Sequence, residues 1–138
     1  MYERRSRDPI ETAERVEGRV LSRSPLGEPL RAYYGFARGR WYGGSFSGYV
    51  IGCNLDCAFC WAWFRNRYEL GSRLSPGEVV RRLIAGGSRA SARVLRISGG
   101  EPTIGFDHLL DVLRAYVRAD PGLRLVVETN GILLGSGG

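Results

Sequence analysis

Short apolar segments alternate with amphipathic ones from residue 46 onward, and this alternation limits the fold more than any other feature of the sequence. Strands are expected at residues 46–51, 94–98 and 125–128. Between them, one helix is expected from a cap at Ser75 to a stop at Gly86-Gly87, and a second around residues 109–117. Strand, helix, strand, helix, strand is the order of a parallel α/β fold, in which right-handed crossovers place both helices on one side of the sheet.

The chain of 138 residues has the size of one domain. We divide it into an N-terminal extension, residues 1–44, and a core domain, residues 45–138. In the extension, an N-cap acid followed by a proline at the first helical position predicts a short helix around residues 9–21. Aromatic segments on either side of residues 37–40 predict a hairpin.

The composition supports a folded chain that does not cross a membrane. Hydrophobic residues make up 43% of the chain, which is enough for a core. No apolar run approaches the roughly 18 residues of a membrane span, and the first residues are charged where a secretory signal would be apolar. We therefore expect a cytoplasmic protein with no membrane partner.

The net charge of +6 comes entirely from arginine, and most of the excess follows the first predicted strand of the core. Residues 53–100 contain eight Arg and three acidic residues. No recognised nucleic-acid-binding motif is present, and interleaved acids dilute the patch, so we do not expect a nucleic acid partner. The alternative is that these arginines are ordinary surface charges on a solvated helix face and on loops.

The only three cysteines, Cys53, Cys57 and Cys60, lie within eight residues directly after the first predicted strand of the core. An odd, tightly clustered set cannot form a disulfide framework and indicates a metal site for zinc or an iron–sulfur cluster. In a structural metal site, protein side chains occupy all four ligand positions, whereas a catalytic site leaves one position open for a substrate, so three cysteines favour a catalytic site. The alternatives are a redox pair of Cys57 and Cys60, or a fourth ligand from Asp56 or His108, although His108 is expected to be a surface or packing residue.

Two motifs together resemble the radical S-adenosylmethionine (SAM) superfamily. The first is the cysteine spacing, with an aromatic residue immediately before Cys60, and the second is Gly99-Gly100-Glu101-Pro102 after the second core strand. The segments Trp41–Gly44 and Trp61–Trp63 resemble uncharacterised iron–sulfur oxidoreductases related to pyruvate formate-lyase activating enzyme. Without the cysteines, the second motif would be read as a plain strand-to-helix connection capped by Thr103.

The resemblance implies a 4Fe-4S cluster held by the three cysteines and a fourth iron that binds S-adenosylmethionine. One electron would cleave that cofactor to methionine and a 5′-deoxyadenosyl radical, which abstracts hydrogen from a substrate that the motifs do not identify. An external donor such as a ferredoxin or flavodoxin would supply the electron. No side chain is assigned as catalytic.

The resemblance also implies where the cofactor would lie. Phe59 and Trp61 would lie near the adenine, and Gly99, Gly100 and Glu101 near the methionine amino group. Asn130 ends the third core strand and is expected to point toward the same site, although Asn130-Gly131 is equally typical of an ordinary turn.

The chain departs from the family in length. The family core is a partial barrel of about six strand–helix units, roughly 180 residues, whereas only three core strands fit here. We therefore expect the N-terminal half of a radical SAM barrel with little turnover alone, as a natural half completed by a second polypeptide, the product of a broken frame, or a fragment. The runner-up is a small structural zinc or iron–sulfur module with a basic partner-binding face.

Overall fold

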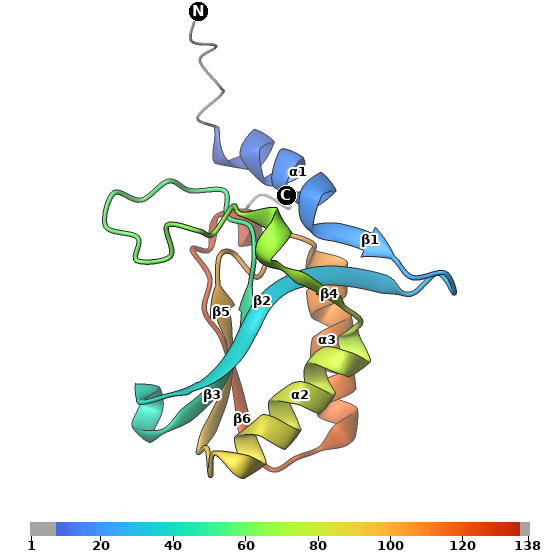
Figure 1. Ribbon diagram of the computed structural model, residues 1–138, viewed down its shortest axis with the longest axis vertical. Helices are drawn as coiled ribbons and strands as arrows, with labels where there is room; N and C mark the ends of the chain where they lie inside the picture. The colour runs from blue at the N-terminus through green and yellow to red at the C-terminus, as the bar shows by residue number, and fades with distance from the viewer. Residues whose placement is uncertain (1–7, 136–138) are drawn as a thin grey trace, which may run out of the picture.

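The computed structural model describes residues 8–135, so the ends of the predicted extension and core domain, residues 1–7 and 136–138, lie outside the described residues. One mixed sheet of six strands runs through the molecule (Figure 1). Its strands are β1 Leu21–Arg23, β2 Pro29–Gly39, β3 Ser45–Val50, β4 Ser72–Leu74, β5 Val94–Gly99 and β6 Arg124–Val127. The order is β1-β2-β3-β5-β6, with β4 also paired to β2.

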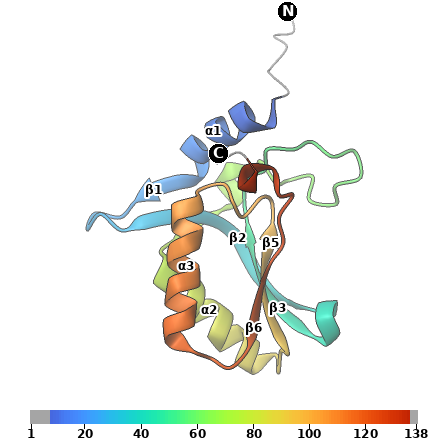
Figure 2. The same ribbon diagram turned by 180° about the vertical axis from the view of Figure 1, so that it is seen from behind.

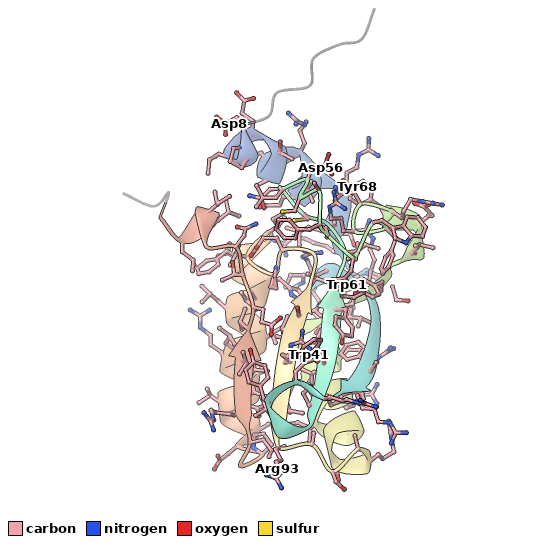
Figure 3. The ribbon with its side chains drawn as sticks, turned by 90° about the vertical axis from the view of Figure 1, so that its left-hand side faces the viewer. Asp8, Trp41, Asp56, Trp61, Tyr68 and Arg93 are labelled. Carbon is pink, nitrogen blue, oxygen red and sulfur yellow. The ribbon has the colours of Figure 1, made fainter. Side chains whose placement is uncertain are left out.

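The predicted α/β core is confirmed. Strands β3, β5 and β6 are parallel, and the two crossover helices, α2 (Pro76–Arg89) and α3 (Phe106–Ala119), pack against each other on one side of the sheet (Figures 1 and 2). The predicted cap is present, because the hydroxyl of Ser75 accepts the N–H of Glu78. The opposite side of these strands carries no α-helix in the described part of the chain, and we call it the open face (Figure 3).

The two faces of the sheet differ in polarity because successive residues of a strand point to opposite sides. Leu95 and Ile97 of β5 are fully buried in the core under α2 and α3, together with Leu83 and Val112. Between them in sequence, Arg96 points to the open face, where it contacts polar and aromatic side chains. The predicted helix of the extension is present as α1 (Pro9–Val20). It crosses the end of the sheet, and a second small core lies beneath it (Figure 1).

The predicted hairpin of the extension is wrong in its details. Residues 37–39, expected as the turn, continue β2, which pairs antiparallel with β3 from Gly39 opposite Ser45 onward. The turn is instead the short 3-10 segment η1, Trp41–Gly43. Pairing with β3 satisfies the backbone of residues 37–39 better than a local turn would. The extension and the core therefore share one sheet.

The predicted stop of α2 at Gly86-Gly87 is also wrong, because the helix continues to Arg89. A Cβ atom on Gly86 would lie 2.1 Å from the ring of Phe46, and one on Gly87 would lie 2.4 Å from Leu95. These glycines therefore allow the helix to approach the sheet closely. Strand β4, residues 72–74, was not expected, because three residues are too few to show a strand period; it forms by pairing with β2.

The helices of the described chain are too short or too polar to span a bilayer. This finding agrees with the absence of a long apolar run in the sequence.

Candidate functional site

The site lies where the carboxyl ends of the three parallel strands meet. Strand β3 leads into the cysteine loop, residues 52–67, β5 leads into the Gly-Gly-Glu-Pro turn, residues 99–102, and β6 leads into Thr129-Asn130-Gly131. Such ends form one edge of a parallel sheet, where α/β proteins place their ligands. A cavity of about 220 Å³ opens there, lined by Cys53, Leu55, Cys57, Ser98, Gly100, Glu101, Glu128, Thr129 and Asn130.

The cysteine loop has no regular secondary structure beyond turns and is held closed by Arg65. The backbone N–H of Gly52 donates to the carbonyl of Arg65 (2.5 Å), and the Arg65 guanidinium donates to the carbonyls of Leu55 (3.3 Å) and Ala62 (3.4 Å). Arg65 also pairs with Asp56, whose carboxylate is otherwise exposed. Asp56 is therefore engaged by an arginine and points to solvent.

All three cysteines are free and partly exposed. The sulfur of Cys53 accepts the N–H of Leu55 (3.5 Å), and the N–H of Cys60 donates to the carbonyl of Cys57 (3.1 Å). Burial raises the pKa of the Cys53 thiol, while the Leu55 N–H lowers it. Within residues 8–135, no three Cys, His, Asp or Glu side chains already converge on a metal position.

The Gly-Gly-Glu-Pro turn packs directly onto the start of the cysteine loop. The N–H of Gly100 donates to the carbonyl of Val50 (2.9 Å), and the N–H of Glu101 donates to the carbonyl of Gly52 (2.8 Å). A Cβ on Gly100 would lie 2.2 Å from that Gly52 oxygen, and Gly99 has φ +103°. Only glycine fits here, which leaves bare backbone beside the cavity.

The carboxylate of Glu101 ties the turn to the end of β6. It is buried, with 1% of the residue exposed. One oxygen accepts the N–H (3.0 Å) and hydroxyl (2.6 Å) of Thr103 and the hydroxyl of Thr129 (2.5 Å), and the other accepts the N–H of Asn130 (2.8 Å). The alternative of Thr103 as a helix cap is wrong, because Thr103 bonds to Glu101 and the N-cap of α3 is Gly105.

Asn130 joins the end of β6 to the cysteine loop. Its amide nitrogen donates to the side-chain oxygen of Asn54 (2.9 Å), and Asn54 in turn donates to the carbonyl of Pro9 at the start of α1 (3.1 Å). Sequence reasoning missed Asn54 and Thr129. Their signal was position alone, since Asn54 lies between two cysteines and Thr129 directly precedes Asn130.

The predicted site residues divide into two groups. Five of them line the cavity: Cys53, Cys57, Gly100, Glu101 and Asn130. Cys60, Gly99, Phe59 and Trp61 lie outside its lining. Phe59 is 90% exposed, and the indole of Trp61 packs edge-on against Tyr49 on the open face (Figure 3).

A charged network crosses the open face beside the cavity. Arg96 of β5 forms a bidentate pair with Glu128 (2.8 and 2.9 Å) and donates to the hydroxyl of Ser47 (3.0 Å). The hydroxyls of Ser98 (2.9 Å) and Tyr42 (3.0 Å) complete the bonding of Glu128. Hydrogen bonding from Arg96 lowers the pKa of Glu128. Sequence reasoning missed Arg96, because an arginine within an apolar strand gives no sign of its partner.

His108, expected to be a surface or packing residue, packs in the interior. It is 3% exposed, and its Nε2 lies 3.0 Å from the carbonyl of Leu74. Burial lowers the pKa of this imidazole. Neither His108 nor the Arg65-bound Asp56 is therefore placed as a fourth metal ligand.

The donor set and the cavity fit a group that takes thiolate ligands and leaves one position to a small molecule. Three free thiols lie on one loop, and two of them line a cavity with bare glycine backbone and polar side chains. Thiolates suit iron–sulfur clusters and zinc.

Comparison with known proteins identifies the family. The model of the radical SAM superfamily matches residues 49–135. A GTP 3′,8-cyclase of Paenarthrobacter nicotinovorans is 33% identical over 85 residues, which are 58% of this chain and 22% of that protein. A 7-carboxy-7-deazaguanine synthase of Hyperthermus butylicus is 34% identical over 92 residues, 65% of this chain and 37% of the relative.

A probable GTP 3′,8-cyclase of Methanococcus maripaludis is 34% identical over 82 residues, 59% of this chain and 26% of the relative. The chain thus spans between 22% and 37% of the length of these curated relatives. No solved structure gives a significant match. Because the family model covers well over half of the sequence and both motifs border one cavity, the chain belongs to the radical SAM superfamily.

Proposed function

We propose that this chain binds a 4Fe-4S cluster and S-adenosylmethionine and takes part in the reductive cleavage of that cofactor. The observation that carries the proposal is one shared cavity, which the cysteine loop, the Gly-Gly-Glu-Pro turn and the end of β6 all border. These segments are up to 77 residues apart in sequence, from Cys53 to Asn130, and the sheet brings them together.

Cys53, Cys57 and Cys60 are the proposed cluster ligands. When bound and reduced by a donor, a 4Fe-4S cluster held by these thiolates would supply the one electron needed to break a carbon–sulfur bond of S-adenosylmethionine, giving methionine and a 5′-deoxyadenosyl radical able to abstract hydrogen. The backbone bond between Gly52 and Arg65 keeps the three thiols within a stretch of 14 residues that is anchored at both ends. Anchoring lowers the entropy lost when the thiols converge.

The chain's own groups would orient the methionine end of the cofactor. Gly100 offers unobstructed backbone, which can accept hydrogen bonds from an ammonium group, and Glu101 holds that backbone in place through Thr103 and Thr129. Ser98 and Asn130 add polar atoms to the cavity wall. We assign Phe59 and Trp61 to contacts with the adenine, which their exposure leaves free to form.

Two partners follow from this proposal. An external donor such as a ferredoxin or flavodoxin would reduce the cluster. A second polypeptide, or a further part of this one, would complete the barrel by pairing with β6, the terminal strand in the described sheet order. We place the reaction in the cytoplasm, where thiols stay reduced.

Electron paramagnetic resonance of the anaerobically reconstituted, dithionite-reduced chain tests the proposal. We expect a reduced 4Fe-4S signal that changes when S-adenosylmethionine is added. Cys57→Ala removes a proposed ligand and should abolish the signal. Asp56→Ala is the matched control on the same loop and should leave the signal intact.

Two outcomes would contradict the proposal. One is a chain without iron that retains zinc tightly and loses it in Asp56→Ala, which would support the structural-module alternative. The other is a cluster whose signal is the same with and without the cofactor, which would remove the cofactor-binding part.

A further inference from the structure

Arg31 is a buried arginine in the N-terminal extension, outside both family motifs. It lies on β2 and is 1% exposed. Its guanidinium donates to four backbone carbonyls, those of Ile104 (2.9 Å), Ala32 (3.0 Å), Ile51 (2.5 Å) and Glu101 (3.3 Å). No carboxylate between residues 8 and 135 forms an ion pair with it.

Three of these carbonyls lie in or directly beside the two segments that border the cavity. Ile51 lies two residues before Cys53, Glu101 lies in the Gly-Gly-Glu-Pro turn, and Ile104 follows that turn. Arg31 thus joins segments 50 residues apart, in addition to the direct backbone bond from Glu101 to Gly52. The planar guanidinium makes these bonds in fixed directions, which lysine cannot reproduce.

The buried charge also matters for the site. Burial lowers the pKa of Arg31 to about 10, so the group stays protonated at neutral pH. The nearby carboxylate of Glu101 acts in the opposite direction and favours the charged form. The buried cation behind the turn therefore offsets the negative charge of Glu101, which lines the cavity together with Cys53 and Cys57.

We infer that Arg31 is a positioning residue of the cofactor site: it holds the Gly-Gly-Glu-Pro turn in register with the cysteine loop and supplies the positive charge behind them. The positioning role does not depend on a cofactor, because the hydrogen bonds of Arg31 are present in the cofactor-free protein. The effect on cluster and cofactor rests on the proposed function. The extension therefore contributes to the site and is more than an appendage.

Amide hydrogen exchange of the cofactor-free protein tests the positional part. Arg31→Lys keeps the positive charge but replaces the planar set of guanidinium N–H donors with a single ammonium group. We expect exchange at the amides of Gly100 and Glu101 to accelerate about tenfold relative to the amides of α2, since a typical hydrogen bond contributes about that factor. Arg73→Met is the matched control, because Arg73 is exposed on the neighbouring β4 and its guanidinium donates to the carbonyl of Arg19 on α1, away from the turn.

An unchanged exchange pattern in Arg31→Lys would overturn the inference, and so would a uniform acceleration that includes α2, since that reports global stability alone. The reconstituted protein gives a second test. We expect Arg31→Lys to retain full iron content and to bind S-adenosylmethionine about tenfold more weakly in equilibrium dialysis.

Arg31→Met removes the charge as well, and its cluster should have a more negative midpoint potential than that of Arg31→Lys. Equal potentials and wild-type cofactor affinity in both variants would refute the charge and positioning roles. If the wild-type chain forms no cluster, the proposed function fails by itself, and the exchange measurement still decides the role of Arg31.

Discussion

Glu101→Gln should destabilise the cofactor-free protein, because the carboxylate is a buried connector between the turn and β6. Glutamine has nearly the same shape but replaces one acceptor oxygen with an NH₂ donor. In the wild type, the N–H of Asn130 donates to a Glu101 oxygen 2.8 Å away. If the carbonyl oxygen of the glutamine keeps its bonds to Thr103 and Thr129, its NH₂ group takes the place of that acceptor and faces the Asn130 N–H. One bond is lost and two donors oppose each other.

The magnitude follows from these contacts. Leaving a buried donor unsatisfied costs about 1–3 kcal/mol, and the three remaining bonds weaken because bonds to a charged acceptor are roughly twice as strong as neutral ones. Removing a buried charge also recovers part of its desolvation cost. We expect a net loss of about 3 kcal/mol in the free energy of unfolding. With a urea slope of about 2 kcal/mol/M, the midpoint should fall by roughly 1.5 M.

Urea unfolding of the cofactor-free protein, followed by circular dichroism, measures this change. Thr129→Ser keeps the hydroxyl that donates to Glu101 and serves as the control, with a midpoint close to that of the wild type. A Glu101→Gln midpoint within about 0.3 M of the wild type would refute the reasoning, since it would mean that the four bonds contribute little net stability.

Two further predictions concern packing and pH. Gly86→Ala places a Cβ 2.1 Å from the Phe46 ring and should lower stability by about 1–3 kcal/mol, whereas Gly77→Ala on the same helix meets open space and should not; thermal unfolding of both variants tests this contrast. Arg96 lowers the pKa of Glu128, so the charged carboxylate stabilises the fold above the unfolded value of about 4.3, and this contribution is lost as pH falls through the lower folded value. Glu128→Gln should therefore reduce the loss of stability in acid, and identical acid titrations of the two proteins would contradict this.

Local signals in the sequence predicted most of the elements and the motifs correctly. Asp8 caps α1 and Ser75 caps α2, as expected, because a cap depends on a side chain and an N–H two or three residues away. The hydrophobic periods of the strands and helices were equally clear. The resulting order of elements predicted a parallel sheet and the meeting of the motifs at one edge of it. Because Cys53, Gly100 and Asn130 each follow the end of a parallel strand, the sequence alone predicted that they lie close together at that edge.

Tertiary structure decided the features that depend on distant partners. Gly86 was expected to stop a helix but serves close packing on Phe46, 40 residues earlier, and residues 37–39 were expected to turn but pair with β3. The role of Glu101 as a connector to β6 and that of Arg31 as a clamp on two loops could not be predicted, since the bonds that make these connections reach 20 to 73 residues along the chain. Caps and periodicity act within a few residues and are written in the local sequence, whereas the partner of a buried polar group is set only when the sheet brings distant segments together.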